Sequence, residues 1–286
     1  MILSLIAGTI VLRPYVFIFL LAYFIACSLH LGFKRAVLFC LAGYFIAWLS
    51  EYSSINNGFP YGRYSYIEST RGRELWVLGV PFMDSVSYVF LAYASYSVAL
   101  AVTAPILFDR RGFYLLETAK IRASLKVRLL SAIFLVCLDI IVDPVALRGS
   151  RWFLGQIYFY PEGGGYFGVP LSNFAGWFVV GFGLICVLQA IDRALSRTKD
   201  YIGFGYPWRY LAGPAIYIGV LAFNLSVTFW IGEYTLGSTG LFIVLLPGVA
   251  IYYLKRLKVA DITTTGKHIA AHRRDYPEAV IPEFPG

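Results

Sequence analysis

The chain has 286 residues, of which 59% are apolar, 18% are aromatic and only 14% are charged. A soluble domain carries roughly 25% charged residues, so this composition excludes an ordinary water-soluble globule. The net charge is +8, but the basic residues gather in short segments between apolar runs. This pattern is typical of membrane orientation signals. We therefore expect membrane lipids around the protein and no nucleic-acid partner.

The apolar runs approach the roughly 20 residues that a helix needs to cross a bilayer. In chain order they cover residues 15–33, 36–51, 77–108, 129–147, 170–191, 210–231 and 238–254. They predict an all-α, polytopic membrane bundle of seven transmembrane helices, with an eighth possible in residues 1–12.

Basic residues cluster in the segments 34–35, 110–128, 193–209 and 255–258, which the positive-inside rule places in the cytoplasm. The loops 52–76, 148–169 and 232–237 then face outward. We expect residues 1–258 to form one transmembrane domain and residues 259–286 to form a polar, largely disordered cytoplasmic tail.

One pattern occurs twice. An acid ends an apolar run, a loop rich in tyrosine and glycine follows, and then come Gly-Val-Pro and a further acid or amide. The two copies are Glu51, Gly79-Val80-Pro81, Asp84 and Asp139 with Asp143, Gly168-Val169-Pro170, Asn173. The pattern predicts a duplicated helix-loop-GVP-helix hairpin with a site between the repeats. The alternative is that each Gly-Val-Pro simply starts a helix, because proline suits the first turn.

A charged group in a membrane costs about 3 kcal/mol on insertion scales, so each one is a candidate functional group. The candidate catalytic residues lie near the outward ends of the runs; they are Glu51, Asp84, Asp139 and Asp143. A further acid, Glu233, lies in a short outward loop and is expected to be solvated.

Asp139 and Asp143 are four residues apart, so a helix places them on one face. Two carboxylates at such a distance resist joint ionisation, and one of them would keep a proton, as a general acid requires. The alternative is that one or both aspartates form salt bridges with Arg148 or Arg151 in the following loop.

The two long outward loops contain the aromatic stretches "NNGFPYGRYSY" (56–66) and "WFLGQIYFYPEGGGYFG" (152–168). Such rings line apolar pockets and stabilise cations over their faces, although a membrane-interface belt would explain them equally well. The candidate substrate-binding residues are Tyr61, Tyr64, Tyr66, Trp152, Tyr166, Asn173 and Trp177.

The sequence contains no GxGxxG, Walker A or HExxH motif, so we predict no cofactor and no metal site. The pair His268 and His272 lies in the polar tail, where a metal site is the less favoured interpretation. The four cysteines lie inside apolar runs without CxxC spacing, which favours small buried side chains over disulfides; they are Cys27, Cys40, Cys137 and Cys186.

Several of these stretches occur together in a known order. They are Glu51 followed six residues later by "GFPYGRYSY", then "LGVP", "DIIVDP" (139–144), Trp152 and "YFGVPLSNFAGW" (166–177). The set resembles the carotenoid biosynthesis membrane proteins, a family that includes carotenoid hydratases acting on acyclic ends of γ-carotene or lycopene and on bisanhydrobacterioruberin. The resemblance covers residues 40–190 and extends more loosely to 255. The family usually has Phe-Gly where this chain has Tyr61-Gly62.

The resemblance implies an integral enzyme of a bacterial or archaeal cytoplasmic membrane, with a cytoplasmic C-terminus and a lipid-soluble carotenoid as substrate. It would add water to a terminal isoprenoid C=C without a cofactor, and the matching motif positions are Glu51, Asp139, Asp143 and Asn173. Besides a structural scaffold, in which replacing the acids would change assembly alone, two alternatives stay open. One is another proton-initiated reaction, a cyclisation or isomerisation, and the other is a lipid transporter or lipid-binding protein, which also uses repeats and intramembrane acids.

Overall fold

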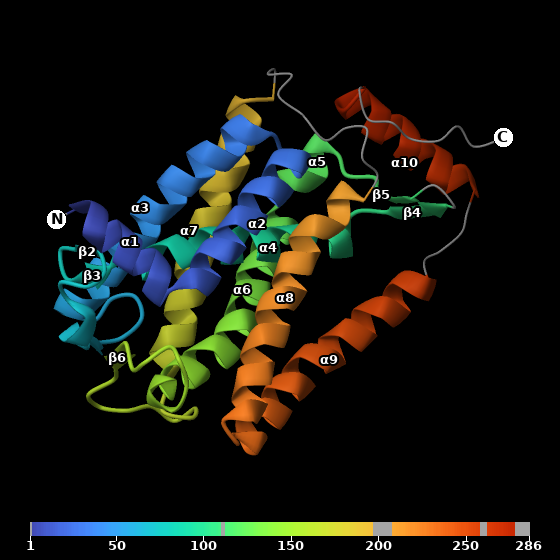
Figure 1. Ribbon diagram of the computed structural model, residues 1–286. Helices are drawn as coiled ribbons and strands as arrows, with labels where there is room; N and C mark the ends of the chain where they lie inside the picture. Colours follow the sequence, from blue (N-terminus) through green and yellow to red (C-terminus); the bar gives the residue numbers. More distant parts are fainter. Residues whose placement is uncertain (1, 110–111, 197–207, 258–261, 278–286) are drawn as a thin grey trace.

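The computed structural model describes residues 2–109, 112–196, 208–257 and 262–277. These residues form a helical bundle with short strands in its loops (Figure 1). The helices are α1 (Ile2–Leu12), α2 (Pro14–His30), α3 (Phe33–Asn57), α4 (Phe82–Thr103), α5 (Ala119–Arg122), α6 (Leu125–Ala146), α7 (Leu171–Ala194), α8 (Arg209–Trp230), α9 (Tyr234–Leu257) and α10 (Ile262–Asp275), with 3-10 turns at Glu68–Thr70 and Gly149–Arg151.

Three two-stranded antiparallel sheets connect the helices. Strand β1 (Ser65–Tyr66) pairs with β6 (Tyr158–Phe159), β2 (Trp76–Val77) pairs with β3 (Val80–Pro81), and β4 (Ile106–Asp109) pairs with β5 (Gly112–Leu115). The predicted all-α bundle is therefore correct for the core but not for these loops.

Within the described residues, the helices α3, α4, α6, α7 and α8 are long and apolar enough to cross a membrane. Helices α1 and α2 meet at a bend of 90°, and they supply a sixth span if they count as one. The break falls at Arg13-Pro14, where proline removes a backbone donor and the preceding residue leaves the helical region. The described apolar part of α9 is the shorter stretch Tyr234–Leu245. The described residues thus supply five or six candidate spans, and the seven or eight predicted are not shown.

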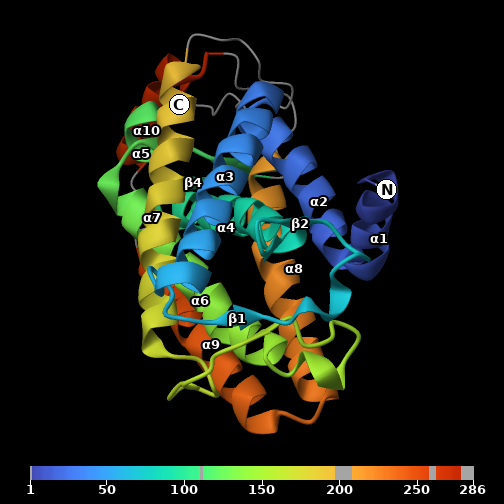
Figure 2. The ribbon, with the colours of Figure 1, turned by 90° about the vertical axis from the view of Figure 1, so that its left-hand side faces the viewer.

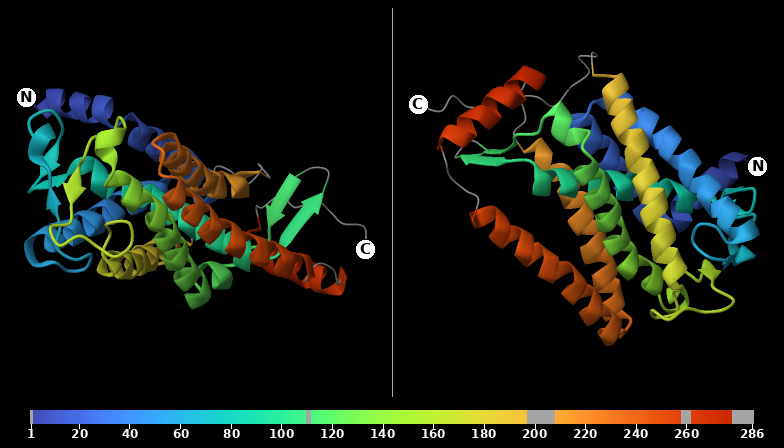
Figure 3. Two further views of the ribbon diagram at one scale, coloured as in Figure 1. Left: turned by 90° about the horizontal axis from the view of Figure 1, so that it is seen from below. Right: turned by 180° about the vertical axis from the view of Figure 1, so that it is seen from behind.

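Helix α4 lies at the centre of the bundle, in contact with α2, α3, α6, α7 and α8 (Figure 2). Of its apolar window 72% is buried, more than in any other candidate span. Helix α9 packs on the outside of α6 and α8 and diverges from the bundle toward its C-terminal end (Figure 3). The apolar outer surfaces of the ring around α4 are left to face lipid, as the composition requires.

The helix within the apolar run 77–108 is shorter than the run, because β-hairpins form at both of its ends. On its N-terminal side, Leu78 and Gly79 have positive φ angles of 47° and 86°, which is the geometry of a tight type I′ turn between β2 and β3. On its C-terminal side, residues 106–109 enter β4 instead of extending the helix.

The second Gly-Val-Pro adopts the same local structure as the first. Phe167 and Gly168 have φ angles of 50° and 93°, and Tyr166 pairs across them with Val169. In both copies the helix begins directly after the proline, at Phe82 and Leu171. The reading of Gly-Val-Pro as a helix start is therefore confirmed, while a duplication of the whole hairpin stays a prediction.

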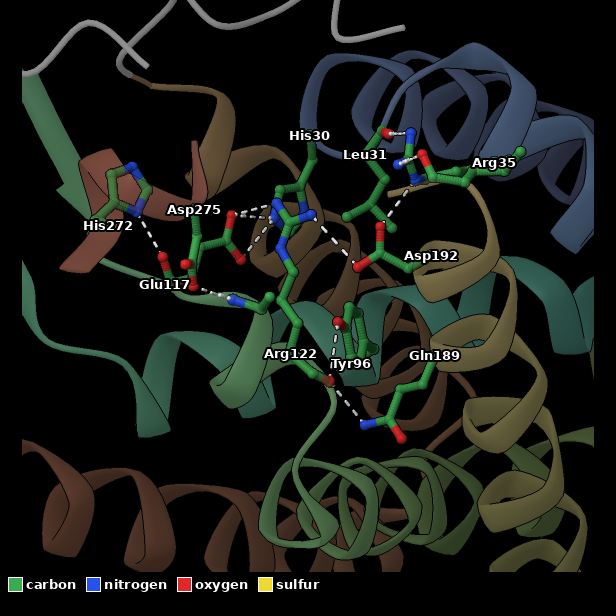
Figure 4. A network of polar contacts seen from close by, with 12 residues as sticks. His30, Leu31, Arg35, Tyr96, Glu117, Arg122, Gln189, Asp192, His272 and Asp275 are labelled. Atoms are coloured by element: carbon green, nitrogen blue, oxygen red, sulfur yellow. Dashed lines mark hydrogen bonds and ion pairs between the residues drawn. The ribbon is translucent and has the colours of Figure 1, made fainter. Parts of the chain in front are cut away.

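The prediction of a largely disordered tail is wrong for residues 262–277, because Ile262–Asp275 form α10. Residues 259–261 and 278–286 of that tail lie outside the described part of the chain. His272 and Tyr276 are buried, and Nδ1 of His272 lies 2.5 Å from the carbonyl oxygen of Glu117 (Figure 4). His272 is therefore bonded through Nδ1 to a backbone carbonyl just before α5.

Glu117 is the centre of a buried polar network at this end of the bundle (Figure 4). It accepts a hydrogen bond of 2.6 Å from Arg122 and lies 3.0 Å from Nε2 of His30, while Asp192 pairs with Arg35 at 2.8 Å. Burial alone would raise the pKa of Glu117, but Arg122 and His30 hold it well below its usual value. The network joins α2, α3, α5 and α7 at the end of the bundle away from β1 and β6 (Figure 1).

Candidate functional site

A cavity with about 960 Å³ of empty space, its mouth included, lies among the helices around α4 and under the loops that carry β1 and β6. Its polar end holds three carboxyl groups, the amide of Asn173 and several phenols. Phe, Val and Leu side chains line its other end, and a second amide, that of Asn224, also belongs to the lining. The predicted site residues that line it are Glu51, Tyr61, Tyr64, Tyr66, Asp84, Asp143, Trp152, Asn173 and Trp177.

Glu51 is buried near the C-terminal end of α3. The phenols of Tyr64 and Tyr66 both donate to its Oε2 atom, the second at 2.6 Å. Both tyrosines come from the loop that directly follows α3 in the chain. The two donors fix one oxygen of this carboxyl group at the polar end of the cavity.

Asp143 is buried near the C-terminal end of α6 and is held by three donors. Tyr158 donates to Oδ1, Tyr160 donates to Oδ2 at 2.9 Å, and Nδ2 of Asn173 donates to Oδ2 at 2.8 Å. The same nitrogen of Asn173 lies 2.7 Å from Oδ2 of Asp139. Donors thus surround both oxygens of Asp143.

The pairing of β1 with β6 explains how two distant loops place their phenols together. Ser65 lies opposite Phe159 and Tyr66 lies opposite Tyr158. Side chains alternate along a strand, so the residues on either side of Ser65 and Phe159 share the opposite face. That face turns toward the cavity and carries Tyr64, Tyr66, Tyr158 and Tyr160, whose rings lie 5.3 to 6.3 Å apart in neighbouring pairs.

These phenols are protonated hydrogen-bond donors, and their environment further disfavours loss of the proton. Burial, followed by the nearby carboxyl groups of Asp84 and Glu51, raises the pKa of Tyr66 well above its usual value. Burial and Asp143 do the same to the pKa of Tyr158. A neutral phenol donates a single hydrogen bond. Tyr66 donates it to Glu51, and Tyr158 donates it to Asp143.

The polar end therefore consists of two similar halves. Each half has an acid near the end of one helix, a Tyr-x-Tyr segment in the next loop and a polar residue in the first turn of the next helix. The halves are Glu51, Tyr64, Tyr66, Asp84 and Asp143, Tyr158, Tyr160, Asn173. This arrangement matches Glu51 to Asp143, whereas the sequence spacing matched it to Asp139.

Tyr158 and Tyr160 were not among the predicted site residues. The signal that could have found them is the repeated pattern in "YSY" (64–66) and "YFY" (158–160), at similar distances after an acid. Tyr88 of α4 was also missed; its ring stacks on Trp177 at 4.2 Å, and both line the cavity.

Asp139 and Tyr166 are not brought into the cavity. Asp139 is fully buried behind Asn173, and its Oδ1 atom has no hydrogen-bond partner among the described residues. Tyr166 packs its ring against Phe167 and Phe174, at 4.9 and 5.5 Å, beside the second Gly-Val-Pro. Of the two predicted aspartates, only Asp143 therefore lines the cavity.

The alternative in which Arg148 or Arg151 neutralises the aspartates is wrong. Nε of Arg148 lies 3.1 Å from Oε2 of Glu233, and Arg151 pairs with the other oxygen of the same carboxylate. The expectation that Glu233 is solvated is also wrong, because its side chain is only 22% exposed and holds both arginines. These two arginines fasten the loop before β6 to the α8–α9 turn. Asp143 is bonded instead by Tyr158, Tyr160 and Asn173.

The far end of the cavity is apolar and aromatic. Phe19, Phe90 and Phe223 meet there, with ring centroids 5.7 Å apart for the first pair and 6.4 Å for Phe19 and Phe223. Such walls accept a hydrocarbon guest, and the rings nearer the acids can stabilise a positive charge on it. The described residues contain no group of three or more His, Cys, Asp or Glu side chains that could hold a metal ion.

The chain matches the family described as carotenoid biosynthesis protein over residues 3–247. The chain belongs to this family. The cavity-lining residues of this carotenoid biosynthesis protein, from Tyr15 to Asn224, all lie within the matched range, and the resemblance noted in the sequence is confirmed.

Among curated proteins, the carotenoid biosynthesis protein is similar to the bisanhydrobacterioruberin hydratase of Haloarcula japonica, at 30% identity over 171 residues. The similarity covers 58% of this chain and 49% of that protein, so the chain spans about half the length of the curated relative it matches. No solved structure matches the chain significantly.

Proposed function

We propose that this carotenoid biosynthesis protein is a membrane-embedded carotenoid hydratase that adds water to a terminal isoprenoid C=C of an acyclic carotenoid end. One observation carries the proposal: two buried carboxyl groups, each held by a pair of tyrosines, face one aromatic cavity. The distant similarity to a hydratase supports the same reaction class.

In the proposed reaction Glu51 is the general acid. Because both phenols donate to Oε2, the other oxygen is the one that presents a proton to the guest. The O–H bond of the acid breaks, a C–H bond forms at the less substituted alkene carbon, and the tertiary carbon becomes cationic. The rings of Tyr64 and Trp177 lie in the cavity wall and stabilise this cation.

Asp143 is the proposed general base. Three donors suit a carboxylate, and Asn173 beside it can also orient a water molecule. The water oxygen bonds to the cationic carbon and its proton passes to Asp143, which leaves a tertiary alcohol. A proton then returns from Asp143 to Glu51, so the net change is the addition of one water and no cofactor takes part in the scheme.

The experiment is to express the chain in a host that makes lycopene and to analyse the carotenoids by mass spectrometry. A product heavier by one water supports hydration. A product of unchanged mass with altered absorption would replace hydration with cyclisation or isomerisation, which begin with the same protonation. An unchanged pool for every acyclic carotenoid supplied would favour a transport or binding role instead.

Two isosteric variants test the roles. Glu51→Gln removes the proton donor and Asp143→Asn removes the proton acceptor, so we expect each to abolish the hydrated product while the protein still inserts into the membrane. Glu233→Gln is the matched control, because this acid lies outside the cavity and its carboxylate pairs with Arg148 and Arg151. Undiminished turnover in either cavity variant removes that residue from the mechanism.

A further inference from the structure

Polar bonds fasten four of the five seams in the ring of helices around α4. They join α2 to α3, α3 to α7, α6 to α7 and α6 to α8. The bonds are Tyr23 Oη to the Ala36 carbonyl (2.7 Å), Arg35 to Asp192 (2.8 Å), Asn173 to Asp139 (2.7 Å) and Tyr217 Oη to the Phe134 carbonyl (2.9 Å).

The fifth seam, between α2 and α8, is closed beside the cavity by aromatic rings. Tyr15 of α2 stacks on Phe223 of α8 with centroids 5.7 Å apart, and Phe19 meets Phe223 edge-on at 6.4 Å. A Cβ atom placed on Gly219 of α8 would lie 3.5 Å from Cε1 of Phe19, so these two residues face each other across the seam.

The same rings form both the seam and the cavity wall. Tyr15, Phe19 and Phe223 line the cavity and are only half-buried. Their helices turn apolar side chains outward next to them, with Ile18 66% and Ile218 64% exposed. At Phe19 one layer of rings separates the cavity from the surface that faces lipid, and the exposed ring of Phe153 packs on Tyr15 and Phe223 at 5.8 and 6.3 Å.

We propose that the α2–α8 seam is a lateral portal, through which the polyene chain of the substrate passes from the bilayer so that its end reaches Glu51. Parting these rings exchanges ring–ring contacts for ring–polyene contacts of similar dispersion energy. Parting the α6–α7 seam beside the cavity would break the Asn173–Asp139 hydrogen bond, and separating the other three seams along their length would break a hydrogen bond or an ion pair. Such bonds are strong in surroundings of low dielectric.

The portal rests on the proposed function, because that function makes the guest a long polyene. Only the end of such a molecule reacts, and a seam open to lipid lets the remaining chain stay in the membrane. Phe223 is the central ring of the seam, since it contacts Tyr15 and Phe19 and also lies 6.2 Å from Trp152 in the cavity wall.

Cross-linking tests the portal. Phe19→Cys with Gly219→Cys is made in a background whose four native cysteines are alanine, and a short bifunctional methanethiosulfonate reagent joins the two thiols. The protein is placed in vesicles that contain lycopene and is then extracted from them. The lycopene bound to the extracted protein and the hydrated product are both measured. We expect the cross-link to abolish both, and a reducing agent to restore them.

The matched control pair is Phe229→Cys with Gly237→Cys. It is again a phenylalanine facing a glycine, but across α8 and α9 and outside the cavity. This cross-link should leave lycopene uptake and hydration as they are. Uptake that persists with the α2–α8 seam linked, or that both cross-links block equally, overturns the portal.

A second pair of variants avoids the cross-linker. Phe223→Leu removes the central ring from the seam and is expected to speed lycopene uptake several-fold. Phe229→Leu, on the same helix, should not change the uptake rate. Equal rates of lycopene uptake in the two variants overturn the portal. The portal is also overturned if the protein is recovered with phospholipid bound in the cavity and never with lycopene. If lycopene enters through the seam and no water is added, the hydratase proposal fails while the portal stands.

Discussion

At the scale of single residues, the site depends on how a phenol differs from other donors. Lysine or arginine beside Glu51 and Asp143 would fix both acids as carboxylates, whereas a neutral tyrosine donates one hydrogen bond and leaves the acid free to hold or release a proton. Each acid has two such partners, and Asn173 adds a third donor on the side of Asp143.

Removal of one phenol should weaken this control without destroying the cavity. A hydrogen bond to a charged group contributes about 1.5–3 kcal/mol, and a factor of ten in rate corresponds to about 1.4 kcal/mol. We therefore expect Tyr158→Phe to lower the rate of hydration by roughly tenfold to a hundredfold, measured by product formation in membranes. Tyr166→Phe is the control, because that phenol lies outside the cavity. Equal losses in both variants would contradict the role of Tyr158.

The residues of the site that the sequence could provide are those whose type is unusual for a membrane. Acids stand out in apolar runs, and Glu51, Asp84 and Asp143 were found in this way. The choice between Asp139 and Asp143 could not be made, because a spacing of four residues places both on one face and only Asn173, from another helix, separates them. Tyr158 was missed because interface tyrosines are common, and the β1–β6 register that selects it joins loops far apart in the chain.

At the scale of elements, α10 shows how a polar segment becomes ordered by a remote contact. Its stretch of sequence has few apolar residues, which favoured disorder in a local reading. The helix docks through His272 on the Glu117 carbonyl, through Asp275 on the amide of Ala119 and through Tyr276 beside Arg122. None of these partners lies near it in sequence. The β4–β5 hairpin was likewise hidden, because its apolar first strand continues the run of α4.

The docking of α10 should depend on pH through His272. Burial lowers the pKa of this imidazole from the usual value of about 6.5, with Arg122 and Arg209 also disfavouring its charge and Glu117 opposing them. The released helix therefore binds a proton more readily than the docked one. Docking keeps its full stability above pH 6.5 and loses it progressively as the pH falls below the pKa of the free side chain.

A fluorophore on Ala270→Cys, an exposed position of α10, can report this release by its anisotropy. We expect anisotropy to fall as the pH is lowered from about 6.5 to about 5. His272→Gln should remove the pH dependence, because the amide can still donate to the Glu117 carbonyl, and His268→Gln should keep it. A transition that survives in the His272 variant would assign the effect to another group.

At the scale of the whole molecule, the two ends of the bundle differ in charge. The end that carries α5 and α10 holds Arg35, Lys120, Arg122 and Lys267, whereas the other end presents the polar mouth of the cavity. The positive-inside rule places the first end in the cytoplasm. We propose this orientation, with the acids beside the outer leaflet.

Single cysteines test the orientation in intact cells. In the background without native cysteines, Ser69→Cys in the exposed 3-10 turn before β2 should react with a membrane-impermeant maleimide added outside. Ala270→Cys on α10 should react only after the membrane is permeabilised. The opposite pattern of labelling would show the reverse orientation in the membrane, with the site at the inner leaflet.

The central position of α4 has a consequence for biogenesis. This helix leaves the ribosome before α6, α7 and α8 exist, yet those helices cover much of its surface in the finished bundle. Until they arrive, a hydroxyl group on the covered side of α4, such as that of Ser97, which is buried against Gly213 of α8 in the final structure, has only the insertion machinery or lipid around it. Assembly therefore cannot proceed helix by helix from the N-terminus, and the reaction chamber closes only when α8 has been synthesised.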